Sequence, residues 1–285
     1  MIRSVNHHAR PWLLRLGDPN RGRDVALYDQ EAIDHTLELV RALGRWLPCF
    51  PTEATGFSNL PPPPALLVMN HSGGDTVLDV WGFMYAWHRH FGAARPLRPL
   101  AHEVLLEQAL TGPFLVRRGV LQADSEVAHR ALTRMRHDVL VMPGGDLETW
   151  RPFRDRHRVC FHGRTGYLKL AARAGVPIVP VAHVGAHATF IVLTRGEKLA
   201  RAMHLHELAR ADVFPIHLSL PWGLGIGPLP HLPWPTRLRY VIGEPIALPS
   251  ADALAPDLAL ALDARVRDAI QAGVDLLLQQ DRPRR

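Results

Sequence analysis

A short apolar run at residues 65–69 is followed at once by a break that contains two glycines, and then by a helical pattern. The run, Ala-Leu-Leu-Val-Met, is typical of a buried strand. The break, Asn-His-Ser-Gly-Gly, occupies residues 70–74, and apolar residues recur at helical spacing through residues 77–85. A histidine, His71, therefore lies where a strand gives way to a helix. In α/β sheets, that end of a strand is where active sites are built.

Two carboxylates, Asp75 and Asp79, follow this histidine, and either one could make it a general base. A carboxylate fixes the tautomer of an imidazole, while the other ring nitrogen takes a proton from a hydroxyl group. In continuous helix, Asp75 would share a face with His71, whereas Asp79 would lie about 12 Å away. Asp79 can reach His71 if residues 72–74 loop out, which two glycines make easy. Both partners stay open, as does the alternative of a helix-capping loop with solvated acids and a structural histidine.

Further apolar runs alternate with helical patterns along most of the chain, which indicates an α/β fold. We expect strands at residues 97–101, 139–142, 176–184 and 237–242, and helices at residues 24–46, 102–111, 127–137, 165–174, 197–210 and 256–280. Gly112 and Pro113 are expected to stop the second helix. Two prolines favour an edge strand at 176–184. With 285 residues, 47% of them hydrophobic, the chain can build one large domain as readily as two small ones.

The basic residues are almost all arginines, since Lys169 and Lys198 are the two lysines of a chain with a formal net charge of +6. Arginine suits phosphate groups, and no basic run is interleaved with aromatic residues in a nucleic-acid pattern. A lipid headgroup or a nucleotide-containing ligand is therefore favoured over nucleic acid. Cys49 and Cys160 imply no disulfide framework, and the first residues lack an apolar signal core, which together predict a cytoplasmic protein.

A second glycine turn follows the strand expected at 139–142, with the sequence Pro-Gly-Gly-Asp-Leu-Glu at residues 143–148. Its glycines let the backbone approach a ligand closely. Four arginines lie within residues 151–158, either as a solvated basic loop or as a phosphate clamp beside the glycines. His183 and His187 have the spacing of helical metal ligands but fall in a strand and a turn, so no metal site is predicted.

Residues 213–235 form an apolar stretch without Asp, Glu, Lys or Arg, and they include Trp222 and Trp234. Six prolines in this stretch argue against a membrane-spanning helix. One interpretation is a strand and a buried loop that close the core. The other is an apolar wall for a ligand, or an interfacial anchor for lipid.

Several motifs, in this order and spacing, resemble the glycerolipid and lysophospholipid acyltransferase family. The chain is similar to its 1-acylglycerol-3-phosphate acyltransferase-like members, in the branch related to the diacylglycerol acyltransferases. The motifs are Asn-His-Ser-Gly-Gly at 70–74 with a following acid, Gly-Val-Leu-Gln-Ala at 119–123, Met-Pro-Gly-Gly-Asp-Leu-Glu at 142–148, Gly-Arg-Thr-Gly-Tyr-Leu-Lys-Leu-Ala at 163–171, Val-Pro-Ile-Val-Pro-Val at 176–181, and Pro-Trp-Gly-Leu-Gly with a later Gly-Glu-Pro within 221–245.

The resemblance implies a fold and covers residues 56–248, while the flanking segments follow from composition and helical spacing. The fold would be α/β, glycerol-3-phosphate acyltransferase-like, with a central, mostly parallel sheet flanked by helices. Residues 1–55 would be an N-terminal arm and helix, with the first 23 residues irregular. Residues 56–248 would be the acyltransferase domain, and residues 249–285 a C-terminal helix and tail, all within one structural domain.

The resemblance also implies an activity, the transfer of a fatty acyl group from acyl-CoA or acyl carrier protein to a hydroxyl of a glycerolipid or lysophospholipid. His71 would be the general base. The family signature has four residues between histidine and aspartate, and here Thr76 holds that position. The branch with His-Ser-Gly-Gly carries its acid later, which favours Asp79 over Asp75. The implied substrate-binding residues are Ser72, Gly73, Gly74, Pro143, Gly144, Gly145, Asp146, Glu148, Arg151 and Arg164.

No cofactor or metal is implied, because acyl-CoA would serve as co-substrate. The expected location is the cytoplasmic face of the membrane, bound peripherally. Two rival hypotheses remain, a non-catalytic protein that binds acyl-CoA or lipid, and a metal-assisted hydrolase built on His71, both acids and another histidine. The acceptor stays open among glycerol phosphate, a lysophospholipid, a partial glyceride and a long-chain alcohol.

Overall fold

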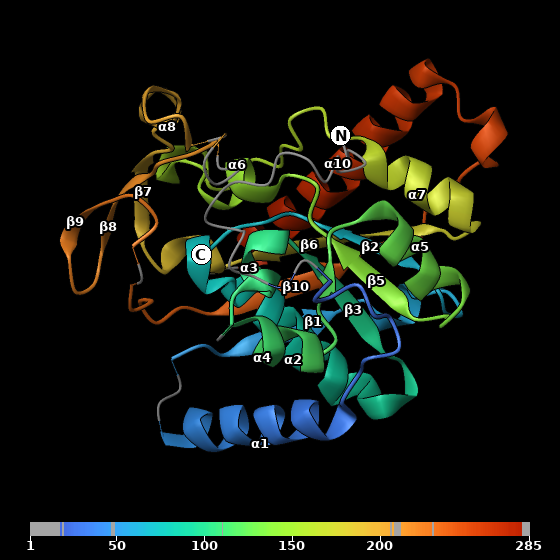
Figure 1. Cartoon of the computed structure of the whole chain (residues 1–285), viewed down its shortest axis with the longest axis horizontal. Coiled ribbons are helices and arrows are strands. Elements are labelled where there is room, and N and C mark those ends of the chain that lie inside the picture. Colours follow the sequence, from blue (N-terminus) through green and yellow to red (C-terminus); the bar gives the residue numbers. More distant parts are fainter. Residues whose placement is uncertain are drawn as a thin grey trace.

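Buried apolar strands build a seven-stranded sheet in the computed structural model, which describes residues 18, 20–46, 49–109, 111–205, 207, 212–229 and 231–280 (Figure 1). The predicted irregular arm at 1–23 lies largely outside these residues. In spatial order the strands are β1 (Thr52–Thr55), β10 (Leu238–Ile242), β6 (Ile178–Val184), β2 (Leu66–Met69), β5 (Asp138–Val141), β3 (Leu97–Ala101) and β4 (Leu121–Gln122). Strands β1 and β4 were not predicted from the sequence.

Strands β6, β2, β5, β3 and β4 run parallel, and β10 is antiparallel to β6, so the expected mostly parallel sheet is confirmed. The prediction that residues 176–184 form an edge strand is wrong, because β6 lies between β2 and β10. Pro180 is tolerated there because it lies opposite Gly243, just beyond the last residue of β10. The Gly243 N–H donates to the Pro180 carbonyl at 2.8 Å, so the missing proline N–H falls where the ladder ends.

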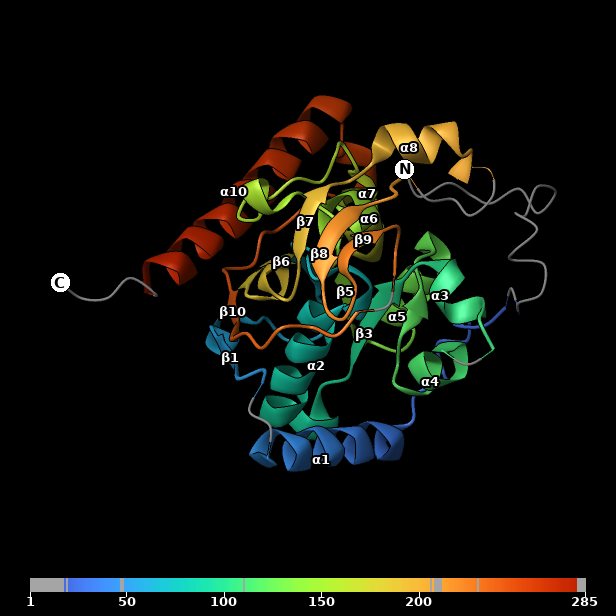
Figure 2. The ribbon, with the colours of Figure 1, turned by 90° about the vertical axis from the view of Figure 1, so that its left-hand side faces the viewer.

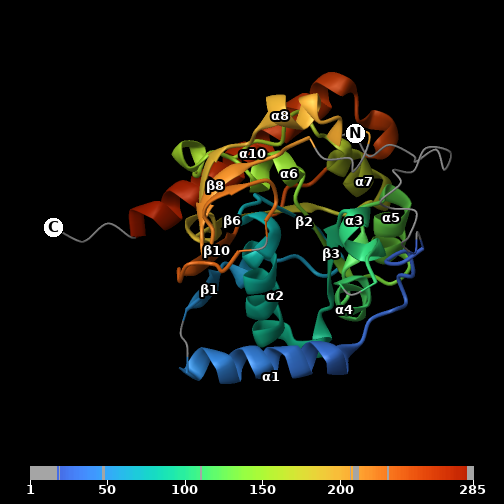
Figure 3. The same cartoon turned by 60° about the vertical axis from the view of Figure 1, so that its left-hand side comes forward.

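Helices cover both faces of the sheet, and the alternation of side chains in β2 explains why. Leu67 and Met69 pack toward α2 (Leu78–Phe91), whereas Leu66 and Val68 pack toward the opposite face. That opposite face is covered by α5 (Ser125–Thr133), α7 (Gly166–Ala174) and α10 (Pro256–Gln280), as Figure 3 shows. A strand with apolar residues on both faces is typical of a parallel sheet buried between helices.

The remaining helices surround this core. They are α1 (Gln30–Trp46), α3 (Glu103–Glu107), α4 (Thr111–Arg117), α6 (Gly145–Thr149) and α8 (Glu197–Ala202). Short 3₁₀ turns are η2 (Phe57–Asn59), η3 (Gly74–Thr76), η4 (Gly92–Ala94), η5 (Phe153–Asp155), η6 (Ala186–Ala188) and η7 (Ala251–Ala253). Within the described ranges, no helix combines the length and the apolar character needed to cross a membrane.

The prediction that Gly112 and Pro113 stop a helix at 102–111 is wrong. The break comes earlier, at Gln108, whose backbone is extended at the end of α3. Gly112 and Pro113 lie in the first turn of α4, where proline is tolerated because its missing N–H would have no partner within the helix. The end of the helix predicted at 197–210 falls on residues that are partly outside the described ones.

A small antiparallel sheet stands beside the main one, with the order β7 (Ile191–Thr194), β8 (Ile216–Ser219) and β9 (Gly223–Ile226). The apolar stretch at 213–235 supplies β8 and β9. Figure 2 views the molecule from the side on which this sheet lies, with α8 next to it.

A buried ion pair fixes the start of the central strands. Asp138, fully buried at the start of β5, accepts a hydrogen bond from Arg95 Nε at 2.5 Å and another from the Ala65 N–H at 2.7 Å. The carboxylate thereby joins the beginnings of β2 and β5.

The ends of the same two strands form the switch point of the sheet. After β2 the chain passes through α2 toward β3, and after β5 it passes through α7 on the other face toward β6. Neighbouring strands whose connections leave in opposite directions open a crevice at their carboxyl ends.

Candidate active site

His71 lies at this crevice, two residues beyond β2, and the two glycines that follow it turn the chain back. Gly73 and Gly74 have φ angles of +102° and +58°, which residues with a side chain rarely adopt. A Cβ on Gly74 would also lie 2.7 Å from the Phe190 ring. The loop that the glycines allow is therefore present, and it shortens the path from His71 to the first turn of α2.

Asp79 is the carboxylate that contacts His71, with Oδ2 at 2.5 Å from Nδ1. Asp79 is fully buried, and it also accepts hydrogen bonds from the Ser72 N–H at Oδ2 and from the Val80 N–H at Oδ1, each at 2.9 Å. Because Nδ1 faces the carboxylate, a neutral His71 carries its hydrogen there and keeps the lone pair on Nε2. Asp75, by contrast, lies in η3 with an exposed side chain.

Burial and charge act in opposite directions on this pair. Burial lowers the pKa of His71, but the Asp79 carboxylate and its hydrogen bond outweigh that effect and leave the pKa raised above its usual value. Burial alone would raise the pKa of Asp79, and the contacts with His71, together with the neighbouring His183 and the Ser72 N–H, hold it below its usual value. Asp79 is therefore an anion that stabilises the protonated imidazole.

A second histidine, His183 in β6, reaches the same carboxylate from the other side. Its Nε2 lies 3.0 Å from Ser72 Oγ and 3.7 Å from Asp79 Oδ2. Burial lowers the pKa of His183 to about 4, so the ring is neutral. The position of His183 beside Asp79 was not predicted from the sequence, where His183 was considered only as a metal ligand, although the alternation of β6 gives a signal. Val179 and Val181 face α2, and period two puts His183 on that face.

Glu148 and Arg151 form the wall behind His71. Glu148, buried in α6, accepts hydrogen bonds from the His71 N–H at 3.1 Å and from the Cys160 N–H at 3.2 Å. Arg151 donates to Glu148 Oε1 at 3.1 Å, to the His71 carbonyl at 3.1 Å and to the carbonyl of Arg158. Burial raises the pKa of Glu148, while the Arg151 guanidinium and the backbone donors oppose that rise. Arg151 is thus committed to protein acceptors on both terminal nitrogens.

The predicted glycine turn at 143–148 lies at the end of the neighbouring strand, β5. Arg164 donates to the Gly144 carbonyl and to Asp146 Oδ1, both at 3.1 Å, and is 3.5 Å from the Pro143 carbonyl. The Gly145 N–H is used within the turn, because it donates to the Met142 carbonyl at 3.1 Å. The turn and Arg164 are therefore joined to each other, with about a third of the Arg164 side chain exposed.

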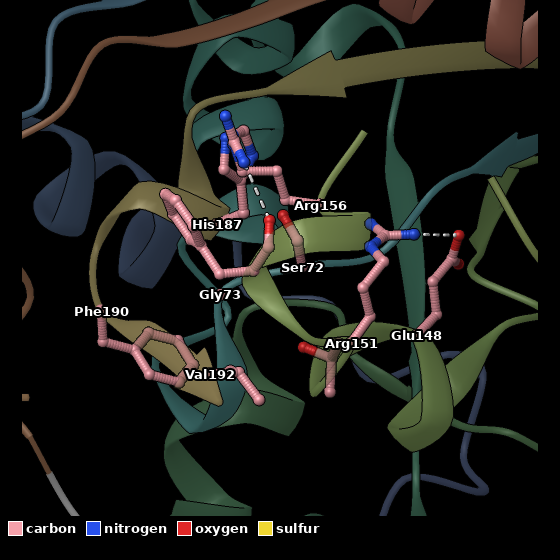
Figure 4. Close-up of a pocket in the computed structure, with 10 residues that line it drawn as sticks. Ser72, Gly73, Glu148, Arg151, Arg156, His187, Phe190 and Val192 are labelled. Carbon is pink, nitrogen blue, oxygen red and sulfur yellow. Dashed lines mark hydrogen bonds and ion pairs between the residues drawn. The ribbon is translucent and has the colours of Figure 1, made fainter. Parts of the chain in front are cut away.

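A small cavity opens between the glycine loop at 70–74, the glycine turn at 143–148 and β7 (Figure 4). Its polar side is made by Ser72, Glu148, Arg151 and Arg156. Its apolar side includes Phe190 and Val192, which the sequence analysis did not single out. The lining residues are Ser72, Gly73, Glu148, Thr149, Arg151, Phe153, Arg156, His187, Phe190 and Val192.

Three further arginines of the predicted basic cluster differ from Arg151 in their exposure. Arg154 and Arg158 are exposed, and Arg156 is half-buried at the cavity with its guanidinium 4.3 Å from the centre of the Phe153 ring. His187 also lines the cavity, and its ring stands edge-on to His157 at a centroid distance of 4.7 Å. Burial lowers the pKa of His187 well below the usual value. Among the described residues, no group of three or more His, Cys, Asp or Glu is arranged to hold a metal ion.

Comparison of the chain with solved structures finds the same fold in the crystal structure of the 1-acyl-sn-glycerophosphate (LPA) acyltransferase PlsC from Thermotoga maritima. The TM-score is 0.51, and the match covers 88% of this chain and 83% of that one at 16% sequence identity. The expected α/β architecture of acyltransferases is thereby confirmed.

Comparison with curated sequences finds uncharacterised mycobacterial proteins. The chain is 32% identical over 235 residues to proteins of Mycobacterium tuberculosis and Mycobacterium bovis, and 31% identical to one of Mycobacterium leprae. These matches cover 80% of this chain, which in turn spans 62% of the length of the first two relatives and 60% of the third.

The family model described as Acyltransferase matches residues 51–184, a range that contains His71, Asp79 and the glycine turn at 143–148. The predicted resemblance to acyltransferases is therefore confirmed over residues 51–184, the part of the chain that matches this family model.

Proposed function

We propose that this protein transfers a fatty acyl group from a thioester, acyl-CoA or acyl carrier protein, to a hydroxyl of a glycerolipid or lysophospholipid. The observation that carries the proposal is the 2.5 Å contact between His71 Nδ1 and Asp79 Oδ2, beside a cavity at the switch point of the sheet. A histidine oriented by a carboxylate is equipped to take a proton from a hydroxyl at its other nitrogen. The match of residues 51–184 to the family model described as Acyltransferase supports the same reaction.

In the proposed reaction, His71 Nε2 accepts the hydroxyl proton as the hydroxyl oxygen attacks the thioester carbonyl carbon. The new C–O bond forms, and the tetrahedral intermediate collapses with cleavage of the C–S bond. The protonated His71 then returns the proton to the departing sulfur. Asp79 stabilises the imidazolium while it exists, in keeping with the raised pKa of His71.

The negative charge on the intermediate requires hydrogen-bond donors, each worth about 3 kcal/mol in such sites. Two pairs of backbone amides are candidates, those of Gly73 and Gly74 and those of Gly144 and Gly145. The structure favours the first pair, because the Gly145 N–H already donates to the Met142 carbonyl.

His183 acts in this scheme as a positioning residue. Its neutral ring lies 3.0 Å from Ser72 Oγ, and the Ser72 N–H donates to Asp79. The Asp79 carboxylate therefore lies between the side chains of His71 and His183. Glu148 and Arg151 secure the backbone of His71 on the opposite side.

The phosphates of the acyl donor, or an acidic headgroup, would be bound by the arginines of residues 151–158, of which Arg151 and Arg156 line the cavity. Arg154, Arg156 and Arg158 suit this role better than Arg151, whose donors are used within the protein. Arg164 would lie close by with Asp146. Phe190 and Val192 would contact the acyl chain. No cofactor is required, since the thioester carries the energy of the reaction, and a lipid acceptor implies work at the cytoplasmic surface of a membrane.

The test is mass spectrometry of the purified protein incubated with a long-chain acyl-CoA and a pool of glycerol phosphate, lysophospholipids, partial glycerides and long-chain alcohols. The proposal expects a new ester, which identifies the acceptor. Release of CoA without an ester, in the presence of all acceptors, would contradict acyl transfer and indicate a thioesterase. Tight binding of acyl-CoA without turnover would favour the non-catalytic alternative.

A further inference from the structure

The outer face of the β7–β9 sheet carries an apolar patch that the core does not cover. Side chains alternate in each strand, so one set points inward and the other outward. The inward set, Val192, His217 and Gly225, is buried, and the first two lie next to Phe190 or Trp150. The outward set makes up the other face of the sheet.

The pairing register brings the outward side chains of neighbouring strands together. Leu218 pairs with Ile191 on one side and with Leu224 on the other, and Ile216 pairs with Ile226. Leu224 and Ile226 are 58% and 51% exposed, which is far more than a core position would allow. The adjoining loops and strand ends add Leu193, Leu220, Trp222 and Leu232, each more than 45% exposed.

Such a patch is unusual for a surface that faces water. Exposed leucines occur singly on most proteins, whereas a contiguous apolar face marks a surface that meets another molecule or a membrane. The stretch from 213 to 235 contains no charged side chain of Asp, Glu, Lys or Arg to interrupt it. Trp222, 53% exposed at the turn between β8 and β9, is of the residue type that favours a membrane–water interface.

The charges beside the patch favour a bilayer with anionic lipids over a second copy of the chain. Helix α8 follows β7 and lies next to the sheet (Figure 2), with Lys198, Leu199 and Arg201 exposed. Met203, which caps the end of α8, is also exposed. Its acid, Glu197, is paired with Arg195 at 3.0 Å. Basic groups around an apolar face attract anionic headgroups, whereas a second copy with the same formal charge of +6 would be repelled.

We infer that the outer face of β7, β8 and β9, with α8 at its rim, is the surface through which this protein docks on an anionic lipid bilayer. This inference rests on the proposed function for the lipid nature of the acceptor. It adds the orientation, because Val192 of β7 lines the active-site cavity while Leu193 beside it points outward. Docking by this face places the cavity on the inner side of the same sheet, separated from the lipid surface by these strands.

The test is co-sedimentation of the full chain with vesicles of phosphatidylcholine alone or with a third of phosphatidylglycerol. The variant carries Leu218→Gln, Leu224→Gln and Ile226→Gln, and the matched control carries Leu39→Gln, Leu260→Gln and Leu276→Gln, which replace leucines of similar exposure on α1 and α10. We expect binding to the anionic vesicles to fall by about 100-fold in the variant, and to be unchanged in the control. Lys198→Glu with Arg201→Glu should reduce the preference for phosphatidylglycerol.

The inference is overturned if the variant binds vesicles as the unaltered protein does. It is also overturned if the protein ignores vesicles and forms a dimer that the variant dissolves, which would make the face a contact between copies. Circular dichroism checks the fold, and the single Leu224→Gln exchange, expected to weaken binding about fivefold, replaces the triple variant if that does not fold. Turnover of a short-chain, water-soluble acceptor is measured alongside, so that failure of catalysis and failure of docking are distinguished.

Discussion

Exchange of Asp79 for Asn separates the charge of the His71 partner from its shape. The carboxylate accepts three hydrogen bonds, from His71 Nδ1 and Ser72 N at Oδ2 and from Val80 N at Oδ1. An amide offers one oxygen and one NH₂ group, so at least one of these buried donors must face another donor. One unsatisfied buried donor costs about 1–3 kcal/mol, and the variant should unfold at correspondingly lower denaturant concentration.

The effect on catalysis should be larger than the effect on stability. If the amide NH₂ faces His71, it donates to Nδ1 and drives the hydrogen of the imidazole to Nε2, the atom that has to accept the substrate proton. We expect the maximal rate to fall by about 10³–10⁴-fold, the size found when a histidine is held in the wrong tautomer. The matched control is Asp75→Asn, an exposed position directly after the same two glycines, which should stay within threefold of the unaltered rate.

The pH dependence of kcat/KM shows whether Asp79 raises or lowers the pKa of His71. His71 has to be neutral to act as a base, and Asp79 raises its pKa, so kcat/KM should rise with pH through an apparent pKa above 6.5. Without the negative charge, burial dominates and the residual activity of Asp79→Asn should titrate below 6.5. Initial rates between pH 5 and 9 measure both limbs. The reasoning is refuted if Asp75→Asn loses as much activity as Asp79→Asn, or if the apparent pKa does not move.

Further variants test the surroundings of the site. Asp138→Ala removes the acceptor of a buried Arg95, and the free energy of unfolding in urea should fall by about 3–5 kcal/mol. A fall of less than about 1 kcal/mol would contradict the role given to this ion pair. His183→Phe should lower kcat about 10-fold with little change in KM, while His183→Asn should recover part of the rate if positioning is the cause. Gly74→Ala combines a positive φ with a contact to Phe190, and should lower the melting temperature and the activity together, whereas an unchanged melting temperature would show that the turn adapts.

The elements that depend on local pattern were predicted well. The strands near 66–69 and 97–101 and the helix at 256–280 follow from apolar runs, periodicity and an early proline, which are properties of the segment itself. The glycine at the end of the helix near 166–174 adopts the left-handed conformation that such a helix end favours. Family motifs supplied the fold and the position of His71.

Features that depend on distant parts of the chain were not predictable in the same way. Strand β6 has the composition of an edge strand, yet it lies inside the sheet. Pro180 is tolerated there because it lies opposite the end of β10, which a sequence pattern does not reveal. The contact of Asp79 with His71 depends on the backbone angles of two glycines. The sequence allowed that loop without requiring it.

The composition of an apolar segment also does not show which of its side chains are buried and which are exposed. Residues 213–235 were read as a wall, an anchor or a buried loop, and the β8–β9 pairing gives one buried face and one exposed face. Likewise, Arg151 and Arg154 look alike in the sequence. The structure buries the first against Glu148 and leaves the second exposed.

Formation of an acylated lipid by the unaltered protein and by His71→Ala, followed by mass spectrometry in the same acceptor pool, tests the central claim most directly. Both proteins are first compared by circular dichroism, because the ring of His71 lies in a hydrogen-bonded site. The account predicts an ester with the unaltered protein and at least a 10³-fold lower rate with a folded His71→Ala variant. A folded variant that still forms the ester at a comparable rate would show that His71 is not the base.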